Sequence, residues 1–239
     1  MNIQETKAIV LSSIKYGDTS LIVRCYTQKF GLKSFIAKGV FTKKKRTSSI
    51  YYPLNEIDIS FALKINEHQL IFLKSSQIAH YYETLHFHPV KSAIVFFISE
   101  LLSLILKEES DNELLYFYLQ HSLKEFDQKQ DNFADFHLIF LIQLTHFLGF
   151  YPNIESEGTL FDLENGFFTN SSSSINMLKA DETVLLKKLL ELHFIDEKKN
   201  NFNQSQRALL LEIIVKYYQI HTNNFKKPNS LLILHQLFS

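Results

Sequence analysis

The chain has 239 residues, of which 46% are hydrophobic and 21% charged, and its formal net charge at pH 7 is zero. This composition excludes global disorder, and the length suits one large domain or two smaller ones. The single cysteine, Cys25, excludes an internal disulfide framework and any cysteine-based zinc site within the chain. The N-terminal residues do not follow the pattern of a signal peptide, and the most apolar run, residues 93–106, is too short for a membrane span. We therefore expect a soluble, cytoplasmic protein.

The first 80 residues are predicted to form short strands. The segments are rich in Ile, Val, Phe, Tyr and Thr, and Gly17-Asp18 and Lys29-Phe30-Gly31 supply turn signals between the first three. Residues 21–26, LIVRCY, alternate between two faces with the period of a strand. Five short strands in about 75 residues favour an OB-fold, a five-stranded barrel that often binds single-stranded nucleic acid. The predicted strands span residues 6–16, 19–27, 32–40, 56–63 and 69–78.

The hydrophobic period changes after Tyr82, and the remainder of the chain is predicted to be mainly helical. A capping box at residues 110–113 begins the second helix, Gly149 and Pro152 end the third, and a hairpin is expected around Asn165-Gly166. The predicted helices span residues 90–107, 113–128, 134–148, 181–194, 205–222 and 230–238. The fold class is therefore α+β and multidomain: an OB-fold domain over residues 1–80, then an all-α domain over residues 81–239 with a small irregular hairpin insertion at about 151–174.

Charge is divided unevenly between these two regions. Residues 1–80 hold 12 Lys and Arg against 5 Asp and Glu, whereas the remaining residues hold 13 against 20. Residues 43–46, KKKR, place four cations side by side, and such a run needs either a solvated loop or an anionic partner. The asymmetry favours an anionic partner for the first region, although ordinary solvation stays an alternative.

Nucleic acid is the partner that a basic barrel suits best. Cations along a groove neutralise phosphates and release counterions, and nearby aromatic rings can stack on bases. Aromatic candidates are Phe35, Phe41, Tyr51 and Tyr52, although most of the 22 Phe and 11 Tyr are expected in the core. We expect Arg24 and Lys33 to share a face with the basic run. The predicted DNA-contacting residues are Arg24, Lys33, Lys38, Lys43, Lys44, Lys45, Arg46 and Tyr51.

Motifs for catalysis and cofactor binding are missing from the sequence. The spacing of the six glycines excludes a Walker A loop and a GxGxxG fingerprint. His86 and His88 form a pair without a third metal ligand nearby, and Cys25 is expected to be buried rather than reactive. We therefore expect no enzymatic activity, cofactor or metal. Two alternatives stay open: an OB-fold RNA-binding or ribosome-associated protein, and a carboxylate site assembled only in three dimensions.

Residues 16–40, YGDTSLIVRCYTQKFGLKSFIAKGV, resemble the opening of the RecO family of bacterial recombination mediators. Residues 144–153, 161–168 and 207–238 resemble later parts of that family in the same order. The resemblance implies an N-terminal OB-fold, a helical C-terminal domain and a role in DNA repair. It also implies binding to single- and double-stranded DNA, annealing of complementary strands, and partnership with RecR and single-strand-binding protein to load RecA, without nucleotide hydrolysis.

The resemblance also bears on the hairpin insertion and on a partner site. Some family members hold zinc there with two Cys-x-x-Cys pairs, but this chain has no cysteine in the region. We expect the hairpin to be held instead by Phe161, Leu163, Phe167 and Phe168. The tail of single-strand-binding protein is acidic and ends in an aromatic residue, which implies a receptor pocket that is apolar and rimmed by cations. Candidates for that rim are Arg207, Lys216, Lys226 and Lys227.

Overall fold

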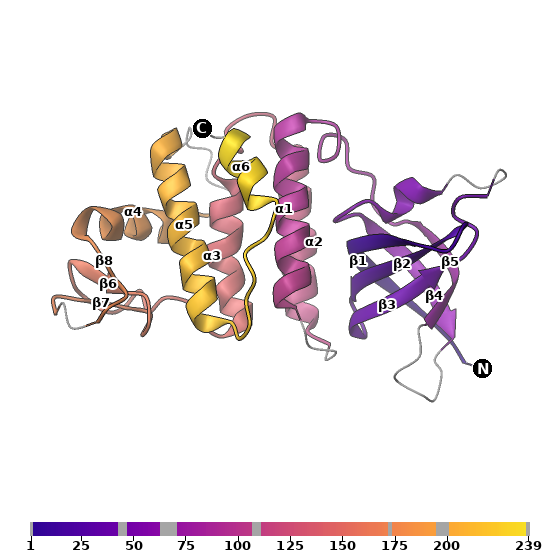
Figure 1. Ribbon diagram of the computed structural model, residues 1–239, viewed down its shortest axis with the longest axis horizontal. Coiled ribbons are helices and arrows are strands. Elements are labelled where there is room, and N and C mark those ends of the chain that lie inside the picture. Colours follow the sequence, from indigo (N-terminus) through magenta and orange to yellow (C-terminus); the bar gives the residue numbers. More distant parts are fainter. Residues whose placement is uncertain are drawn as a thin grey trace. The chain divides into compact units, whose positions relative to one another are not determined.

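The computed structural model describes residues 2–42, 47–62, 71–106, 111–171, 174–194 and 201–237 (Figure 1). The chain divides into two compact units, Met1–Asp127 and Gln128–Ser239. Strands give way to helices after Ile78, whereas the division between the units comes after the second long helix. A domain boundary at residue 80 therefore stays a prediction.

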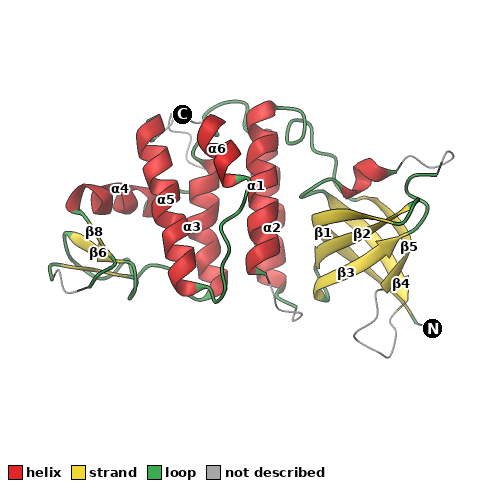
Figure 2. Cartoon of the chain, viewed as in Figure 1, coloured by secondary structure: helices red, strands yellow, loops and turns green. Residues whose placement is uncertain are grey.

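The first unit contains a closed five-stranded barrel (Figure 2). Its strands follow the order β1-β2-β3-β5-β4, and every neighbouring pair is antiparallel except β3 and β5, which are parallel. The long strand β1 closes the barrel because its first half pairs with β4 and its second half pairs with β2. This topology confirms the predicted OB-fold. The strands are β1 Ile3–Tyr16, β2 Ser20–Thr27, β3 Gly31–Ala37, β4 Glu56–Ala62 and β5 Ile71–Ile78.

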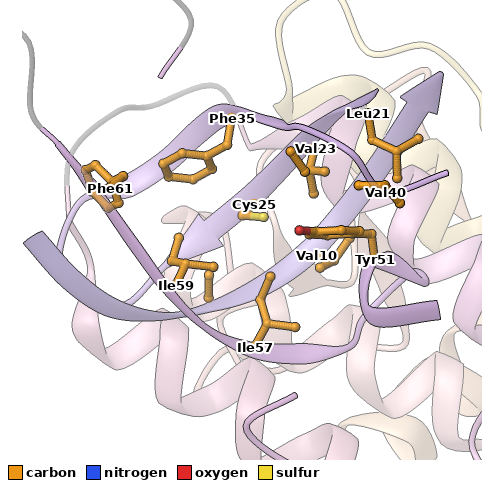
Figure 3. Close-up of a cluster of buried hydrophobic side chains, with 12 residues drawn as sticks. Val10, Leu21, Val23, Cys25, Phe35, Val40, Tyr51, Ile57, Ile59 and Phe61 are labelled. Atoms are coloured by element: carbon orange, nitrogen blue, oxygen red, sulfur yellow. The ribbon is translucent and has the colours of Figure 1, made fainter. Parts of the chain in front are cut away.

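Alternate side chains of the strands fill the barrel interior (Figure 3). Phe35 and Phe61 lie with ring centroids 5.0 Å apart, and Cys25 is fully buried beside Val23 and Ile59. The predicted burial of Cys25 is confirmed, and this burial raises the pKa of its thiol. Tyr51, from the short 3-10 helix η1 (Ser48–Tyr51), also points into this core.

Two helices complete the first unit, α1 (Pro89–Ile105) and α2 (Glu113–Gln128). Ser110 of the predicted capping box lies outside the described residues, and the side chain of Asn112 accepts a hydrogen bond of 3.0 Å from the Leu115 amide instead. Near the end of α2, the Asp127 carboxylate accepts hydrogen bonds of 2.8 Å from the amides of Glu83, Thr84 and Leu85. This carboxylate fixes the segment between β5 and α1.

The second unit combines helices with a small sheet of order β7-β6-β8. The Asp162 carboxylate accepts hydrogen bonds from the amides of Glu164 and Asn165, and Gly166 has φ 71°, so the predicted hairpin is confirmed. Its elements are α3 Phe136–Leu148, β6 Leu160–Asp162, β7 Phe167–Thr169, β8 Met177–Leu178, α4 Ala180–Leu190, α5 Gln204–His221 and α6 Leu231–Leu237.

Three of the four predicted hairpin core residues are buried. Phe161, Leu163 and Phe168 are at most 5% exposed, whereas Phe167 is 36% exposed. Successive residues of a strand point to opposite faces, so Phe168 takes the inward position and Phe167 the outward one. The prediction for Phe167 is therefore wrong.

Candidate nucleic-acid interface

The outer face of the barrel carries a row of apolar side chains across four strands. In the strand register Ile14 pairs with Ile22, Ile22 with Ile36, and Ile36 with Phe72. These residues point away from the interior because their strand neighbours, such as Val23 and Phe35, fill the core. Ile14 and Phe72 at the two ends of the row are 64% and 37% exposed. The middle of the row, Ile22 and Ile36, lies on strands β2 and β3, the face that OB-folds use for oligonucleotides.

Cations and a second aromatic residue lie beside this row. Tyr16, Lys38 and Lys74 each follow a row residue by two positions, so they continue the same face, and all three are exposed. The Lys38 ammonium lies 4.0 Å from the centroid of the Phe72 ring. We call this set the strand surface; it consists of Ile14, Tyr16, Ile22, Ile36, Lys38, Phe72 and Lys74. None of these residues is acidic, and the adjoining turn contributes one carboxylate, Asp18.

The basic run Lys43, Lys44, Lys45 and Arg46 lies outside the described residues. The chain on either side of it is anchored at the end of β3. The Thr42 hydroxyl donates a hydrogen bond of 2.9 Å to the Gly39 carbonyl, and the Thr47 amide donates one of 3.4 Å to the Val40 carbonyl. The Phe41 amide donates to the Thr19 carbonyl at 3.2 Å. The chain therefore enters and leaves the run beside the turn that joins β1 and β2.

Arg24 and Lys33 do not share a face. Arg24 points outward, and its guanidinium donates hydrogen bonds of 2.9 and 3.0 Å to the carbonyls of Ser103 and Leu106 at the C-terminal end of α1. Burial lowers the pKa of Arg24, and the helix end satisfies the charge. Lys33 pairs with Cys25 and therefore lies on the inward side of β3. The expectation that both residues lie on one DNA-binding face is wrong.

Of the four aromatic residues predicted to stack on bases, two are buried and two are exposed. Tyr51 is 4% exposed and its hydroxyl shares a hydrogen bond of 2.6 Å with Ser76, while Phe35 is fully buried. A buried ring has no face to offer a base, so these two predictions are wrong. Phe41 and Tyr52 are 44% and 52% exposed and stay available.

Sequence reasoning missed several members of the strand surface, notably Tyr16, Phe72 and Lys74. The signal was the period-2 pattern of β5, in which Ile71 and Leu73 pack against the core while Phe72 and Lys74 alternate with them. The parallel pairing of β3 with β5 then brings Phe72 beside Ile36, and that pairing is not visible in the sequence.

Of the residues predicted to receive a protein partner, Arg207 has a structural role instead. Its Nε lies 2.7 Å from Oδ1 of Asp135, both side chains are largely buried, and the guanidinium also donates to the Phe202 carbonyl at 2.7 Å. The prediction for Arg207 is therefore corrected. Lys216, Lys226 and Lys227 are exposed. A small depression in the same unit is lined by four apolar side chains, two basic ones, one acidic one and two amides: Phe133, Phe136, Ile139, Phe194, Lys129, His193, Asp135, Asn132 and Asn201.

The described residues contain no group of three or more His, Cys, Asp or Glu side chains that could hold a metal ion. Nε2 of His86 forms a hydrogen bond of 2.8 Å with Oδ1 of Asn55, and burial lowers the pKa of this imidazole. Among the described helices, none has the length and apolar character needed to cross a membrane.

Family models match both parts of the chain. The model described as recombination protein O N terminal matches residues 1–82, and the model described as recombination protein O C terminal matches residues 86–230. The chain belongs to the RecO family of DNA repair proteins. The resemblance expected from residues 16–40 is thereby confirmed.

Relatives named DNA repair protein RecO match the chain over nearly its whole length. Those of Flavobacterium psychrophilum and Flavobacterium johnsoniae are each 40% identical over 238 residues, covering 98% of this chain and 99% of the relative. The relative from Christiangramia forsetii is 35% identical over 236 residues, covering 98% of each chain. The closed barrel lies within the part matched by the RecO N-terminal model.

Proposed function

We propose that this RecO-family protein binds single- and double-stranded DNA through its barrel and anneals complementary strands. With RecR it helps to load RecA onto DNA coated by single-strand-binding protein. The observation that carries the proposal is the strand surface, an OB-fold face with exposed cations, exposed aromatic rings and no acidic member. Family membership supports the role in repair.

Annealing by such a surface is an electrostatic process. Lysines that neutralise phosphates release condensed counterions and reduce the repulsion between two approaching strands. Thr42 and Thr47, which flank the basic run in the sequence, are hydrogen-bonded to the carbonyls of Gly39 and Val40, shortly after Lys38 of the strand surface. Base pairing then supplies the free energy, and no bond to the protein is made or broken. The process therefore needs neither nucleotide hydrolysis nor a divalent metal.

The helical unit is proposed to receive protein partners. Lys216, Lys226 and Lys227 are exposed cations that suit the acidic tail of single-strand-binding protein. Arg207 is left out of this set because Asp135 already neutralises it in a buried pair. The proposed roles of RecR and RecA rest on family membership, and no surface described above is assigned to either protein.

The test is annealing of complementary oligonucleotides detected by fluorescence, with and without single-strand-binding protein. We expect acceleration over the uncatalysed rate in the absence of ATP and of divalent metal. A strict requirement for either, or no acceleration by the folded protein, would contradict the proposal. Parallel binding to DNA and RNA of one sequence tests the alternative RNA-binding role, because only an RNA reader should gain affinity from the 2′-hydroxyl.

A further inference from the structure

We infer that Phe72, together with Lys38, is a base-stacking platform by which the barrel distinguishes single-stranded from double-stranded DNA. The inference rests on the proposed DNA binding and adds to it which side chains contact bases rather than phosphates. Phe72, on β5, is the last residue of the apolar row and pairs with Ile36 of the neighbouring strand β3.

The Phe72 ring is both accessible and firmly supported. The ring is 37% exposed, so a ligand can reach it. Ile36, which pairs with Phe72 on the neighbouring strand, is only 4% exposed and supports the ring from one side. The Lys38 ammonium lies 4.0 Å from the ring centroid. In the free protein, therefore, a cation occupies the position above the ring that a flat group would take.

A nucleobase competes well for this position. Stacking of a base on an aromatic side chain contributes more than a cation–π contact does at an exposed site, so a base is expected to displace the ammonium. The displaced Lys38 stays within one side-chain length of the stacked nucleotide and can pair with its phosphate. Lys74, two residues from Phe72 on the same face of β5, offers a second cation to the same strand.

The charges favour a single strand of nucleic acid over a protein as the occupant. Within the strand surface the charged members are Lys38 and Lys74 and neither is balanced by an acidic member. A purely apolar protein partner would leave these ammonium groups desolvated, whereas a polyanion with exposed bases satisfies both the cations and the ring.

Discrimination follows from where the bases are. In a duplex the base faces are stacked inside the helix, so a ring on the barrel surface can reach only sugars and phosphates. In a single strand the bases can be splayed onto the ring. Phe72 should therefore contribute to single-strand affinity and not to duplex affinity, whereas the surrounding cations contribute to both.

The chain has no tryptophan, which makes a direct test possible. In Phe72→Trp, the new indole is the only tryptophan and reports stacking as quenching of its fluorescence. The matched control is Phe87→Trp, at a more exposed phenylalanine (78%) that lies in the segment before α1 and belongs to no strand of the barrel. We expect oligothymidylate to quench the Phe72→Trp signal, and duplex DNA or the control variant to give no comparable quenching.

A second variant measures the affinity without a new fluorophore. Phe72→Leu keeps an apolar side chain but removes the π face, and it should weaken binding to oligothymidylate about tenfold while leaving duplex binding unchanged. Fluorescence anisotropy with labelled DNA gives both affinities. Equal quenching by duplex, no quenching by a bound single strand, or equal loss on both DNAs would overturn the inference. Failure of the wild-type protein to bind either DNA would instead contradict the proposed function.

Discussion

The guanidinium of Arg24, on β2, donates a hydrogen bond of 2.9 Å to the carbonyl oxygen of Ser103, near the C-terminal end of α1. A second bond of 3.0 Å reaches the Leu106 carbonyl. The last carbonyls of a helix have no partner within the helix, and they carry a partial negative charge. Arg24 therefore joins the barrel to α1 and supplies the cation that this helix end needs.

Replacing Arg24 with alanine should destabilise the first unit and not act primarily on DNA. We expect the free energy of unfolding to fall by about 1–3 kcal/mol, because two charge-assisted hydrogen bonds are lost. Arg24→Lys should restore only part of it, since an ammonium cannot reproduce the two-pronged geometry. Urea unfolding measures the effect. Unchanged stability together with a reduced salt dependence of DNA binding would assign Arg24 to DNA instead.

The Asp127 carboxylate should make the first unit sensitive to acid. Burial alone raises the pKa of this group, but hydrogen bonds from the amides of Glu83, Thr84 and Leu85 and from the Thr84 hydroxyl outweigh it, so the net pKa is lowered. A lowered pKa stabilises the folded state fully above the ordinary value of about 3.9, and this contribution is lost as pH falls through the folded pKa.

Asp127→Asn is the matching variant because it keeps the size of the side chain. We expect it to lower the free energy of unfolding at neutral pH by about 2–4 kcal/mol, since an amide cannot accept the same set of bonds. The difference from the wild-type protein should narrow as the pH falls below about 4. Thermal unfolding as a function of pH measures this, and a constant difference down to acid pH would argue against the assigned role.

Arg207 and the exposed lysines of the second unit should separate stability from partner binding. Arg207→Ala leaves the buried Asp135 carboxylate without its cation and should cost about 3–5 kcal/mol of unfolding free energy.

Lys226→Ala with Lys227→Ala should change stability by less than about 0.5 kcal/mol and weaken binding of an acidic peptide that ends in an aromatic residue. Unaltered peptide binding in the lysine variant would remove these residues from the partner site.

Lys38 should contribute one phosphate contact to a bound single strand. Lys38→Met is expected to make the logarithmic salt slope of oligothymidylate binding shallower by about 0.7. Lys29→Met is the control, because Lys29 is equally an exposed barrel lysine but lies in the turn between β2 and β3, where it donates to the Glu5 carbonyl. If both variants change the salt slope equally, Lys38 contributes only to the general electrostatic attraction between the barrel and DNA and does not mark a specific phosphate contact on the strand surface.

The sequence was sufficient to predict the five barrel strands, the α-helices and the hairpin at Asn165-Gly166, because each depends on local periodicity and turn chemistry, whereas η1 and β8 were not predicted. The direction in which individual side chains point was harder to predict from the sequence. Arg24 and Lys33 lie on neighbouring strands, and only the register with Cys25 reveals that they point to opposite sides. Tyr51 follows the basic run closely in sequence, yet η1 turns it into the core.

Long-range pairings account for the remaining misses. Phe72 belongs to the strand surface only because β5 pairs in parallel with β3, across a connection of more than thirty residues. Arg207 is neutralised by Asp135, 72 positions earlier in the chain. Neither relationship leaves a periodic pattern, so the sequence alone did not show that Phe72 lies beside Ile36 or that Arg207 is neutralised in a buried pair.

The most direct test of the account is the salt dependence of DNA binding by a variant in which Lys43, Lys44, Lys45 and Arg46 are all replaced by glutamine. If the barrel binds DNA by neutralising phosphates, four lost contacts should weaken single-strand binding and make the logarithmic slope less negative by up to about 2.8. A slope equal to that of the wild-type protein would contradict the account and leave the basic run as a solvated loop.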